Sequence, residues 1–286
     1  MKIVETEIDL KNTLDVARAA NREIVLVPTM GALHVGHLSL VEAAKSGDRN
    51  PFVVVSVFVN PLQFGEGEDF ERYPRTLEAD AKLLEAREAD LLFAPLVGEV
   101  YPRGSVGAIT KHAGPIGETL EGASRPGHFD GMLTVVARLF DLVEPDRVIF
   151  GAKDAQQLFL VREMARADYP SLLVQAAPTV REPGGLALSS RNRYLSATDK
   201  LQATELFGAL RTAGAELEAG APLATVLEAH RRQLEVDAPK AKLDYLQLVS
   251  ATDFEPVSDD FHGQAILVIA AKIGETRLID NLEVLI

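Results

Sequence analysis

The sequence contains no cysteine and no long hydrophobic run. Without cysteine the chain cannot form disulfides, and nothing else in it points to secretion. The longest apolar run, residues 52–59, is far shorter than the ~20 residues of a membrane-spanning helix. Residues 1–5 lack the apolar segment of a secretory signal peptide. We therefore expect a cytoplasmic protein without a membrane partner.

The chain also lacks an excess of positive charge. It has 29 Lys and Arg against 42 Asp and Glu, a net charge of −13, and a sequence pI of about 5.0. Proteins that bind a nucleic-acid backbone usually carry a basic patch or have a high pI. The charge balance therefore argues against tRNA or DNA as the main partner. It does not exclude a nucleotide, which needs only a few local cations.

A glycine- and histidine-bearing turn is the most informative stretch that the sequence does contain. An apolar run at residues 24–27 precedes the segment PTMGALHVGH at residues 28–37, and apolar residues at helical spacing follow it. Glycines let the backbone approach a ligand closely, and the N-terminus of a helix suits phosphate. His34 and His37 share a face if the first helical turn includes both. The pattern favours a polyphosphate site over two ordinary surface histidines.

Zinc is a weaker interpretation of the same histidines. Tetrahedral zinc sites need three or four protein ligands. The chain has no cysteine and no H-E-x-x-H motif. The histidine pair is therefore interpreted as part of a nucleotide site.

The first part of the chain has the pattern of a Rossmann-like α/β fold with a doubly wound parallel sheet. With 286 residues, the chain is long enough for one large domain or two smaller ones. Helical patterns separate five expected strands, at residues 24–27, 51–59, 90–95, 147–150 and 172–176. The expected helices between and after them cover residues 77–89, 132–143 and 154–167. In such sheets, ligands bind at the carboxyl ends of the strands.

The pattern changes after about residue 180. Ser196 and Asp199 have the spacing of a capping box and open a helix that we expect to reach residue 219. A second helix is expected at residues 223–234, and strands at 242–249 and 265–271. These elements predict a smaller α+β domain. We therefore expect a Rossmann-like domain of residues 1–179 and a C-terminal domain of residues 180–286.

Polar turns after other strands offer further groups for a ligand. Lys153 and Asp154 stand between a strand and a helix, where they suit phosphate and ribose, although an ordinary turn with a solvated lysine is an equal alternative. Gln63 follows the second strand, and Gln157 lies in the first turn of a helix. Amides supply donors and acceptors without charge, which suits a small polar acid. Taken singly, each glutamine is more simply explained as a surface residue.

Two loops and one helix complete the candidates. Ser189, Ser190 and Arg191 follow a pair of glycines and can clamp phosphates, although taken alone they also fit a linker at the domain boundary. The glycine-rich residues 122–131 open a helix and form either another wall of the site or a simple connection. Asp80 lies on an acidic helix and can reach Mg²⁺, whereas most such carboxylates are solvated.

Taken together, the motifs resemble the pantothenate synthetase (pantoate–β-alanine ligase) family, within the superfamily that carries HIGH and KMSKS motifs. The matching blocks run in the family's order from residue 28 to 281, and they are PTMGALHVGH, FVNPLQF, ERYPRTLEAD, RPGHFDGMLTVV, FGAKDAQQ, LALSSRNRYLS and ETRLIDN. One block alone is weak evidence, but the whole set is specific and spans nearly the entire chain.

The resemblance implies a homodimeric enzyme that condenses pantoate with β-alanine, using ATP and Mg²⁺, through a pantoyl adenylate. It implies catalytic roles for His34, His37, Lys153, Ser189, Ser190 and Arg191. It implies pantoate or β-alanine contacts for Gln63 and Gln157, and a link to Mg²⁺ for Asp80. The implied ATP contacts are Met30, Gly31, Ala32, Leu33, His34, Val35, Gly36, His37, Gly151, Ala152, Lys153, Asp154, Val180, Leu188, Ser189, Ser190 and Arg191.

The chain departs from the family pattern at two positions. Val35 replaces the common Ile of the HIGH motif and keeps its β-branched bulk. Ala152 stands where many members have Glu, which removes one side contact but not the lysine beside it.

Three other functions fit part of the pattern. A nucleotidyltransferase that stops after transferring AMP would share the fold and the ATP site, but Gln63 and Gln157 suit a hydroxy acid better than a second phosphate. A tRNA-charging enzyme is disfavoured by the low pI and by the lack of an anticodon-binding domain. A non-enzymatic scaffold is disfavoured by the intact His34, His37, Lys153 and Arg191.

Overall fold

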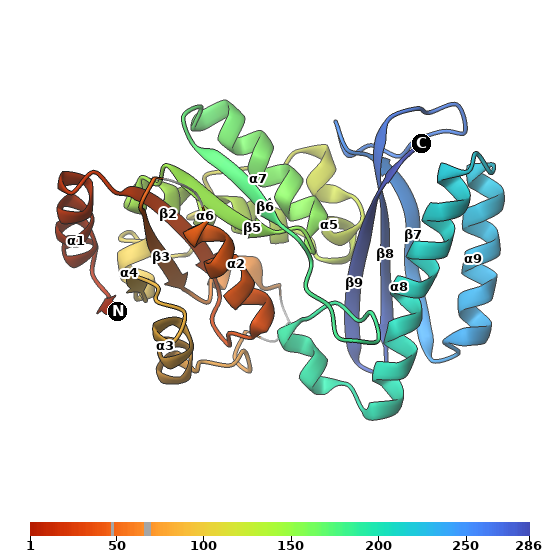
Figure 1. Ribbon diagram of the computed structural model, residues 1–286, viewed down its shortest axis with the longest axis horizontal. Coiled ribbons are helices and arrows are strands. Elements are labelled where there is room, and N and C mark those ends of the chain that lie inside the picture. The colour runs from red at the N-terminus through yellow and green to blue at the C-terminus, as the bar shows by residue number, and fades with distance from the viewer. Residues whose placement is uncertain (47–48, 66–69) are drawn as a thin grey trace. The chain divides into compact units, whose positions relative to one another are not determined.

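The chain is divided into two compact units. The computed structural model describes residues 1–46, 49–65 and 70–286. The N-terminal unit comprises Met1–Ala152 and Gln156–Pro178, and the C-terminal unit comprises Lys153–Ala155 and Thr179–Ile286 (Figure 1). Each unit buries a hydrophobic core of its own.

A parallel sheet with the strand order β1-β4-β3-β2-β5-β6 forms the centre of the N-terminal unit. Its strands are β1 (Lys2–Val4), β2 (Glu23–Thr29), β3 (Pro51–Val57), β4 (Leu91–Phe93), β5 (Arg147–Gly151) and β6 (Leu173–Ala177). The expected α/β sheet is confirmed, but it has six strands instead of five. The strand that the sequence analysis missed, β1, has three residues at an edge of the sheet, which is too short to produce a periodic signal.

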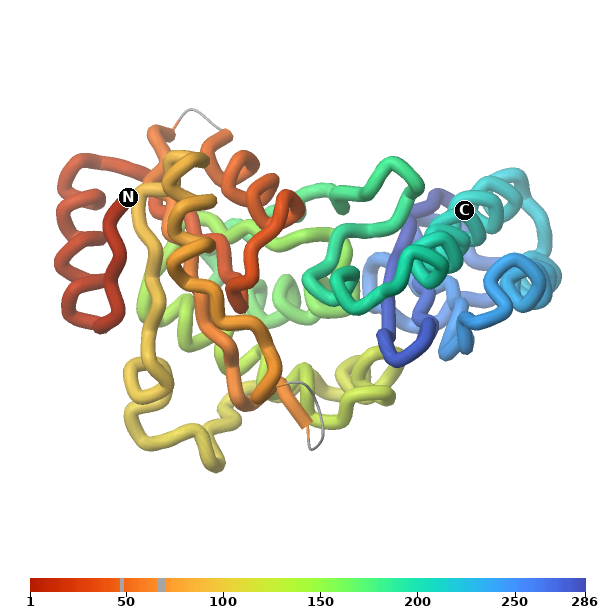
Figure 2. Tube along the Cα trace, turned by 90° about the horizontal axis from the view of Figure 1, so that it is seen from below, coloured from red at the N-terminus to blue at the C-terminus, as the bar shows by residue number. Residues whose placement is uncertain are grey.

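Helices cover both faces of this sheet. They are α1 (Glu7–Ala19), α2 (Val35–Lys45), α3 (Leu77–Glu85), α4 (Val97–Val100), α5 (Glu121–Ser124), α6 (His128–Val143) and α7 (Ala155–Asp168). Alternate residues of β2 point to opposite faces: Leu26 packs in a core with residues of α1, α6 and α7, and Val27 packs in a core with residues of α2 and α3. On the second face α2 and α3 lie next to each other (Figure 2).

In the N-terminal unit, two helix boundaries differ by four residues from the expected ones. The helix expected at residues 77–89 ends at Glu85, and the turn that follows it contains Glu88 with a positive φ of 55°. The helix expected at 132–143 already begins at His128, because Gly127 adopts a left-handed conformation just before it. In the part of the chain that is described, no helix combines the length and the apolar content that a bilayer crossing requires.

The C-terminal unit packs two helices on an antiparallel sheet. The helices are α8 (Ala197–Glu218) and α9 (Leu223–Asp237), and the strands are β7 (Ala241–Ser250), β8 (Gln264–Ile273) and β9 (Thr276–Leu285), in the order β7-β8-β9. The predicted cap of α8 is confirmed, because Ser196 Oγ accepts the Asp199 N–H at 3.1 Å. The sequence analysis missed β9, whose buried Asp280 and Asn281 interrupt its apolar pattern.

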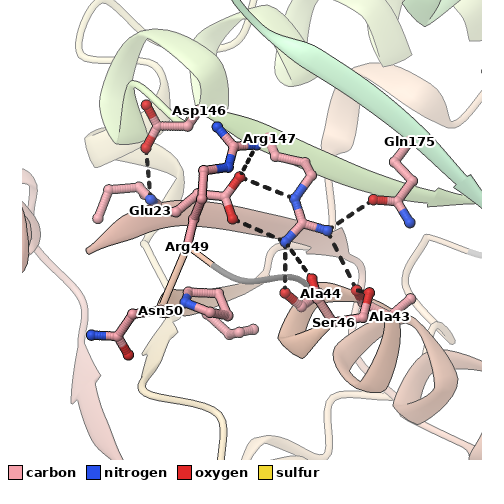
Figure 3. A network of polar contacts seen from close by, with 12 residues as sticks. Glu23, Ala43, Ala44, Ser46, Arg49, Asn50, Asp146, Arg147 and Gln175 are labelled. Carbon is pink, nitrogen blue, oxygen red and sulfur yellow. Dashed lines mark hydrogen bonds and ion pairs between the residues drawn. The ribbon is translucent and has the colours of Figure 1, made fainter. Parts of the chain in front are cut away.

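A buried guanidinium connects the central strands to α2 at the amino-terminal edge of the parallel sheet (Figure 3). Arg147, at the start of β5, is 4% exposed and forms a two-point ion pair with Glu23 of β2, with N–O distances of 3.1 and 3.3 Å. It also donates to Gln175 of β6 at 2.8 Å. Its remaining bonds run to the carbonyl oxygens of Ala43, Ala44 and Ser46. These carbonyls lie at the C-terminal end of α2, where a helix leaves carbonyls without partners four residues ahead.

Replacing Arg147 by alanine should lower the free energy of unfolding by about 3–5 kcal/mol, because Glu23 would remain buried with fewer partners. Urea unfolding followed by circular dichroism measures this loss. A matched control is Arg87→Ala, since Arg87 pairs with Glu42 at 2.7 Å on the surface. We expect the control to cost about 0–1 kcal/mol. Equal losses in the two variants would contradict a stabilising role for the buried network.

Candidate active site

Polar turns follow β2, β3 and β5 at the carboxyl edge of the parallel sheet. From β2 the chain proceeds through β3 to β4 on one side, whereas β5 and β6 lie on the other side. The direction of winding therefore reverses between β2 and β5. Ligands of open α/β sheets bind at this kind of position. Three of the predicted segments, which contain His34, Gln63 and Gly151, begin there.

The turn after β2 has a strained backbone. Gly31 has φ of +83° and Ala32 has φ of +52°. A Cβ on Gly31 would lie 2.9 Å from Val57 Cγ1, so both the conformation and the space require glycine. Ala32 has no such freedom, and a left-handed non-glycine residue costs about 1–3 kcal/mol unless its surroundings hold it.

Asp80 of α3 holds this turn. Its carboxylate accepts the N–H of Ala32 at 3.0 Å and the N–H of Leu33 at 2.8 Å. Thr76 Oγ1 lies 3.2 Å from both carboxylate oxygens. With 1% of its surface exposed, Asp80 stabilises the turn from within the protein.

The structure does not support the expected metal role of Asp80. Mg²⁺ is bound by oxygens that can share its hydration shell, whereas both Asp80 oxygens are buried and accept hydrogen bonds from the chain. The sequence revealed the charge of Asp80 but not the direction in which it points.

The two histidines of the motif form a reciprocal cap at the start of α2. His34 is the N-cap residue, and its Nδ1 accepts the Gly36 N–H at 3.1 Å. The Nδ1 of His37 accepts the N–H of His34 at 3.3 Å. The ring centroids are 4.1 Å apart. Since a backbone N–H can only donate, both Nδ1 atoms are unprotonated acceptors, and the proton of each neutral ring lies on Nε2.

Gln63 ends a 3-10 turn, Pro61–Gln63, that follows β3. The Nδ1–H of His128, at the start of α6, donates to the Gln63 carbonyl at 2.9 Å, and Arg125 donates to the same oxygen at 3.3 Å. The glycine-rich residues 122–131 therefore contact this turn. The sequence analysis had left their role open.

The two glutamines of α7 have different environments. The side chain of Gln156 is buried and bonds to Ile116, Thr119 and Glu121, so it fixes a neighbouring loop. Gln157, the predicted substrate ligand, is half-buried in the first turn of the helix. Within residues 1–46, 49–65 and 70–286, the Gln157 amide forms no hydrogen bond of the kind that fixes Gln156.

Lys153 belongs to the C-terminal unit together with Asp154 and Ala155. Its Nζ lies 3.5 Å from Asp154 Oδ1, and its carbonyl accepts the Nδ2–H of Asn281 at 2.7 Å. Asn281 is itself fixed by its neighbour, because its N–H donates to Asp280 Oδ1 at 2.8 Å. Asp280 forms a two-point ion pair with Arg181 at 2.5 and 2.9 Å.

The sequence analysis gave Arg181, Asp280 and Asn281 no role, although the last two belong to the ETRLIDN block. The guanidinium of Arg181 also stacks over the ring of Phe207 at 3.5 Å. The available signal was the adjacent polar pair Asp280 and Asn281 between the apolar residues 278–279 and 282. That pattern indicates that the two side chains form specific polar contacts, but it does not identify the partners, Arg181 and Lys153.

The serine–arginine segment continues a short hairpin. The Leu188 N–H donates to the carbonyl of Val180 at 2.9 Å, so two predicted ATP contacts are backbone neighbours. Ser189 then caps a 3-10 turn, Ser190–Tyr194, and its Oγ accepts the Arg191 N–H at 3.2 Å. The side chains of Ser189, Ser190 and Arg191 are half-buried.

Asp80→Asn tests the assignment of this carboxylate to the turn. The amide places an NH₂ group against one of two backbone N–H donors, so we expect faster hydrogen exchange in residues 30–37 and a loss of about 1–3 kcal/mol in the free energy of unfolding. Both are measured without ATP or Mg²⁺. Glu78→Gln, in the same turn of α3 but exposed, should change neither. A residue that only binds a metal would leave the exchange rates of the ligand-free protein unaltered.

Proteins of known identity resemble the chain over almost its whole length. It is 53% identical over 258 residues to a pantothenate synthetase of Leifsonia xyli, covering 90% of this chain and 88% of that protein. It is 50% identical over 274 residues to a pantothenate synthetase of Acidothermus cellulolyticus, covering 94% and 88%.

Solved structures of the same kind of enzyme resemble the fold of the chain. The crystal structure of pantothenate synthetase from Thermus thermophilus matches with a TM-score of 0.89 and 48% identity, over 100% of both chains. The pantoate-β-alanine ligase of Francisella tularensis, complexed with beta-gamma ATP and β-alanine, matches with a TM-score of 0.76 and 34% identity, over 99% of this chain and 97% of that one. The model of the pantoate-β-alanine ligase family matches residues 2–283. The chain belongs to the pantoate–β-alanine ligase family of enzymes.

Proposed function

We propose that the chain condenses pantoate with β-alanine in two steps at the carboxyl edge of its parallel sheet. In the first, a carboxylate oxygen of pantoate attacks the α-phosphorus of ATP, the bond to the bridging oxygen breaks, and pyrophosphate leaves. In the second, the amine of β-alanine attacks the acyl carbon, a proton is lost from nitrogen, and AMP leaves. The observation that carries this proposal is the reciprocal histidine cap at the start of α2.

The histidine cap suits the phosphates of ATP. Because both Nδ1 atoms accept backbone N–H groups, His34 and His37 offer Nε2–H as their donors. The backbone N–H groups of the first turn of α2 add a partial positive charge. Negative charge grows on the phosphates as pyrophosphate leaves, and one preorganised donor is worth about 2.7–4 kcal/mol in such a step.

We assign the remaining ATP contacts to three segments. Met30–His37 and Gly151–Asp154 bind the nucleotide with their backbones, and Lys153 neutralises phosphate charge. Ser189, Ser190 and Arg191 supply two hydroxyls and a donor fork for the triphosphate, and Val180 and Leu188 contact the nucleotide beside them. Support comes from the backbone bond that joins Val180 to Leu188 and from the bond that fixes the Lys153 carbonyl.

Mg²⁺ enters this scheme as part of the substrate. ATP binds Mg²⁺ through its phosphate oxygens, and the ion commonly keeps several waters in protein sites. Since the Asp80 carboxylate is buried and bonded to backbone N–H groups, it does not fit as a ligand of that ion. We therefore do not propose Asp80 as a ligand of the Mg²⁺ ion.

Gln63 and Gln157 are proposed to bind pantoate, with Gln63 also near β-alanine. We further propose that the N-terminal unit binds ATP and pantoate and that the C-terminal unit contributes the Ser-Ser-Arg loop. The protein is expected to act as a cytoplasmic homodimer without a nucleic-acid or membrane partner. The net charge of −13 argues against a nucleic-acid partner, and the absence of cysteine fits a cytoplasmic location.

The purified protein should catalyse an exchange of pyrophosphate into ATP that requires pantoate and Mg²⁺ but not β-alanine. The reason is that the first step is reversible and complete without the amine. Radiolabelled pyrophosphate measures it directly. If the folded protein showed no pantoate-dependent exchange yet formed pantothenate from all three substrates, the adenylate step would be wrong; if it did neither, the proposed function would be wrong.

Lys153→Ala should lower the turnover of the exchange reaction at least tenfold, because a cation beside the phosphates would be lost. Its melting temperature should stay near that of the unchanged protein, since the Lys153 Nζ pairs with the adjacent Asp154, at 3.5 Å, and so does not link distant segments in this contact. Lys272→Ala is the control, as that lysine pairs only with a surface carboxylate among the described residues. Near-normal kinetics of Lys153→Ala would remove Lys153 from the site.

A further inference from the structure

Asn60 and Tyr101 form a chain of buried hydrogen bonds that ends on Gln63. Asn60 is 0% exposed, and Tyr101 and Gln63 are 6% and 8% exposed. The Tyr101 hydroxyl lies 2.8 Å from Asn60 Oδ1, and Asn60 Nδ2 lies 3.0 Å from Gln63 Oε1. Tyr101 follows α4 and is 41 residues away from Asn60 in the sequence. No motif of the sequence indicated this contact.

Two backbone groups determine which way the amide of Asn60 points. Its Nδ2 donates to the carbonyl of Gly131 at 3.0 Å, and a carbonyl can only accept. Its Oδ1 accepts the N–H of Leu62 at 3.3 Å, and a backbone N–H can only donate. A flipped amide would lose both bonds. The orientation of Asn60 therefore follows from chemistry that does not depend on distinguishing nitrogen from oxygen.

The hydroxyl of Tyr101 reinforces the same orientation. Since Asn60 Oδ1 is an acceptor, the hydroxyl donates to it. Burial raises the pKa of Tyr101, so the hydroxyl keeps the proton that this bond needs. Removing the hydroxyl would leave Asn60 Oδ1 with the longer bond to Leu62 alone among these partners.

The orientation of Asn60 in turn determines that of Gln63. The Asn60 NH₂ group requires an acceptor, so the atom of Gln63 that faces it is Oε1. A flipped Gln63 would set two NH₂ groups against each other. The group of Gln63 that remains for a ligand is therefore Nε2, which has two donors and no lone pair to offer.

The main chain of Gln63 is held as firmly as its side chain. A Cβ on Gly131 would lie 2.0 Å from the Leu62 carbonyl oxygen, so α6 packs directly on the turn that carries Gln63. His128 and Arg125 donate to the Gln63 carbonyl. With backbone and amide both fixed, Gln63 has little freedom to present its oxygen to a ligand.

We propose that Tyr101 is a positioning residue for the ligase reaction: acting through Asn60, it makes Gln63 present its NH₂ group to the acid substrate. This inference rests on the proposed role of Gln63 in binding pantoate. A donor-only group suits a carboxylate or hydroxyl oxygen of a hydroxy acid. It rejects a protonated amine, which also carries only donors. Gln63 can therefore bind an oxygen of pantoate or the carboxylate of β-alanine, but its NH₂ group disfavours the β-alanine ammonium group at this position.

Tyr101→Phe tests the proposal, because it removes one hydroxyl and keeps the ring. In the pyrophosphate exchange assay, we expect the KM for pantoate to rise about tenfold, the effect of one lost hydrogen bond, while the KM for ATP stays unchanged. Tyr169→Phe is the matched control, since the Tyr169 hydroxyl bonds to Asp141 at 2.8 Å in the same unit. The control should alter neither constant. Equal KM values for pantoate in Tyr101→Phe and the unchanged protein would overturn the inference.

A double-mutant cycle separates positioning from a general structural effect. The dissociation constant of pantoate is measured by calorimetry for Tyr101→Phe, Gln63→Ala and the double variant. If Tyr101 acts through Gln63, its replacement has no further effect once Gln63 is alanine. The same fold-loss in both backgrounds would overturn the proposal. Pantoate-dependent exchange by the unchanged protein, alongside such a result, would leave the proposed function intact; absence of that exchange would overturn both.

Gln63→Glu tests which atom of the amide faces the substrate. Glutamate keeps an oxygen for Asn60 but replaces the NH₂ group with a second oxygen. We expect it to weaken pantoate binding at least as much as Gln63→Ala does. Binding close to that of the unchanged protein would mean that the oxygen of Gln63 faces pantoate, and it would overturn the inference.

Discussion

The buried guanidinium of Arg147 is the constraint on which the arrangement of the N-terminal unit depends. A charge inside a protein is tolerated only when it is paired and its donors are used. Arg147 meets this condition by bonding to Glu23, to Gln175 and to three carbonyls at the end of α2 (Figure 3). It thus fixes β2, β5, β6 and one helix relative to one another. Because α2 is a single 11-residue helix held at its C-terminus, the position of the histidine cap at its N-terminus follows.

A second buried charge, the Asp80 carboxylate, holds the turn that precedes the histidine cap. Ala32 keeps a positive φ, whose cost of about 1–3 kcal/mol has to be offset by its surroundings. The Asp80 carboxylate provides two charge-assisted bonds to that turn, each worth about 1.5–3 kcal/mol. The backbone between β2 and α2 is therefore fixed by one buried cation at the far end of the helix and one buried anion beneath the turn. Asp80, an acidic residue near the nucleotide motif, thus accepts hydrogen bonds from backbone N–H groups of the protein itself.

Much of the fold and of the candidate site could be predicted from the sequence, because both depend on local patterns. Long apolar strands such as β3 and the capped helix α8 have periodicities that reveal them, and the strand–turn–helix context singled out His34 and Lys153. Contacts between distant segments could not be predicted in this way. Asn281 bonds to Lys153 across 128 residues, and Tyr101 bonds to Asn60 across 41. Periodicity carries no information about such pairs. For Asp80, the sequence showed an acidic side chain on a helix but not that its carboxylate points to the N–H groups of Ala32 and Leu33.

His34, His37 and Asn60 are oriented in the same way, by hydrogen bonds to main-chain groups. Histidine and amide side chains are ambiguous, since either ring nitrogen or either amide atom can face a partner. In His34, His37 and Asn60 a main-chain group removes the ambiguity, because an N–H can only donate and a carbonyl can only accept. The fold thus converts fixed backbone positions into fixed donor positions on side chains. Donors that are already aimed need no reorganisation when charge develops on a phosphate, which is the condition under which they stabilise a transition state most.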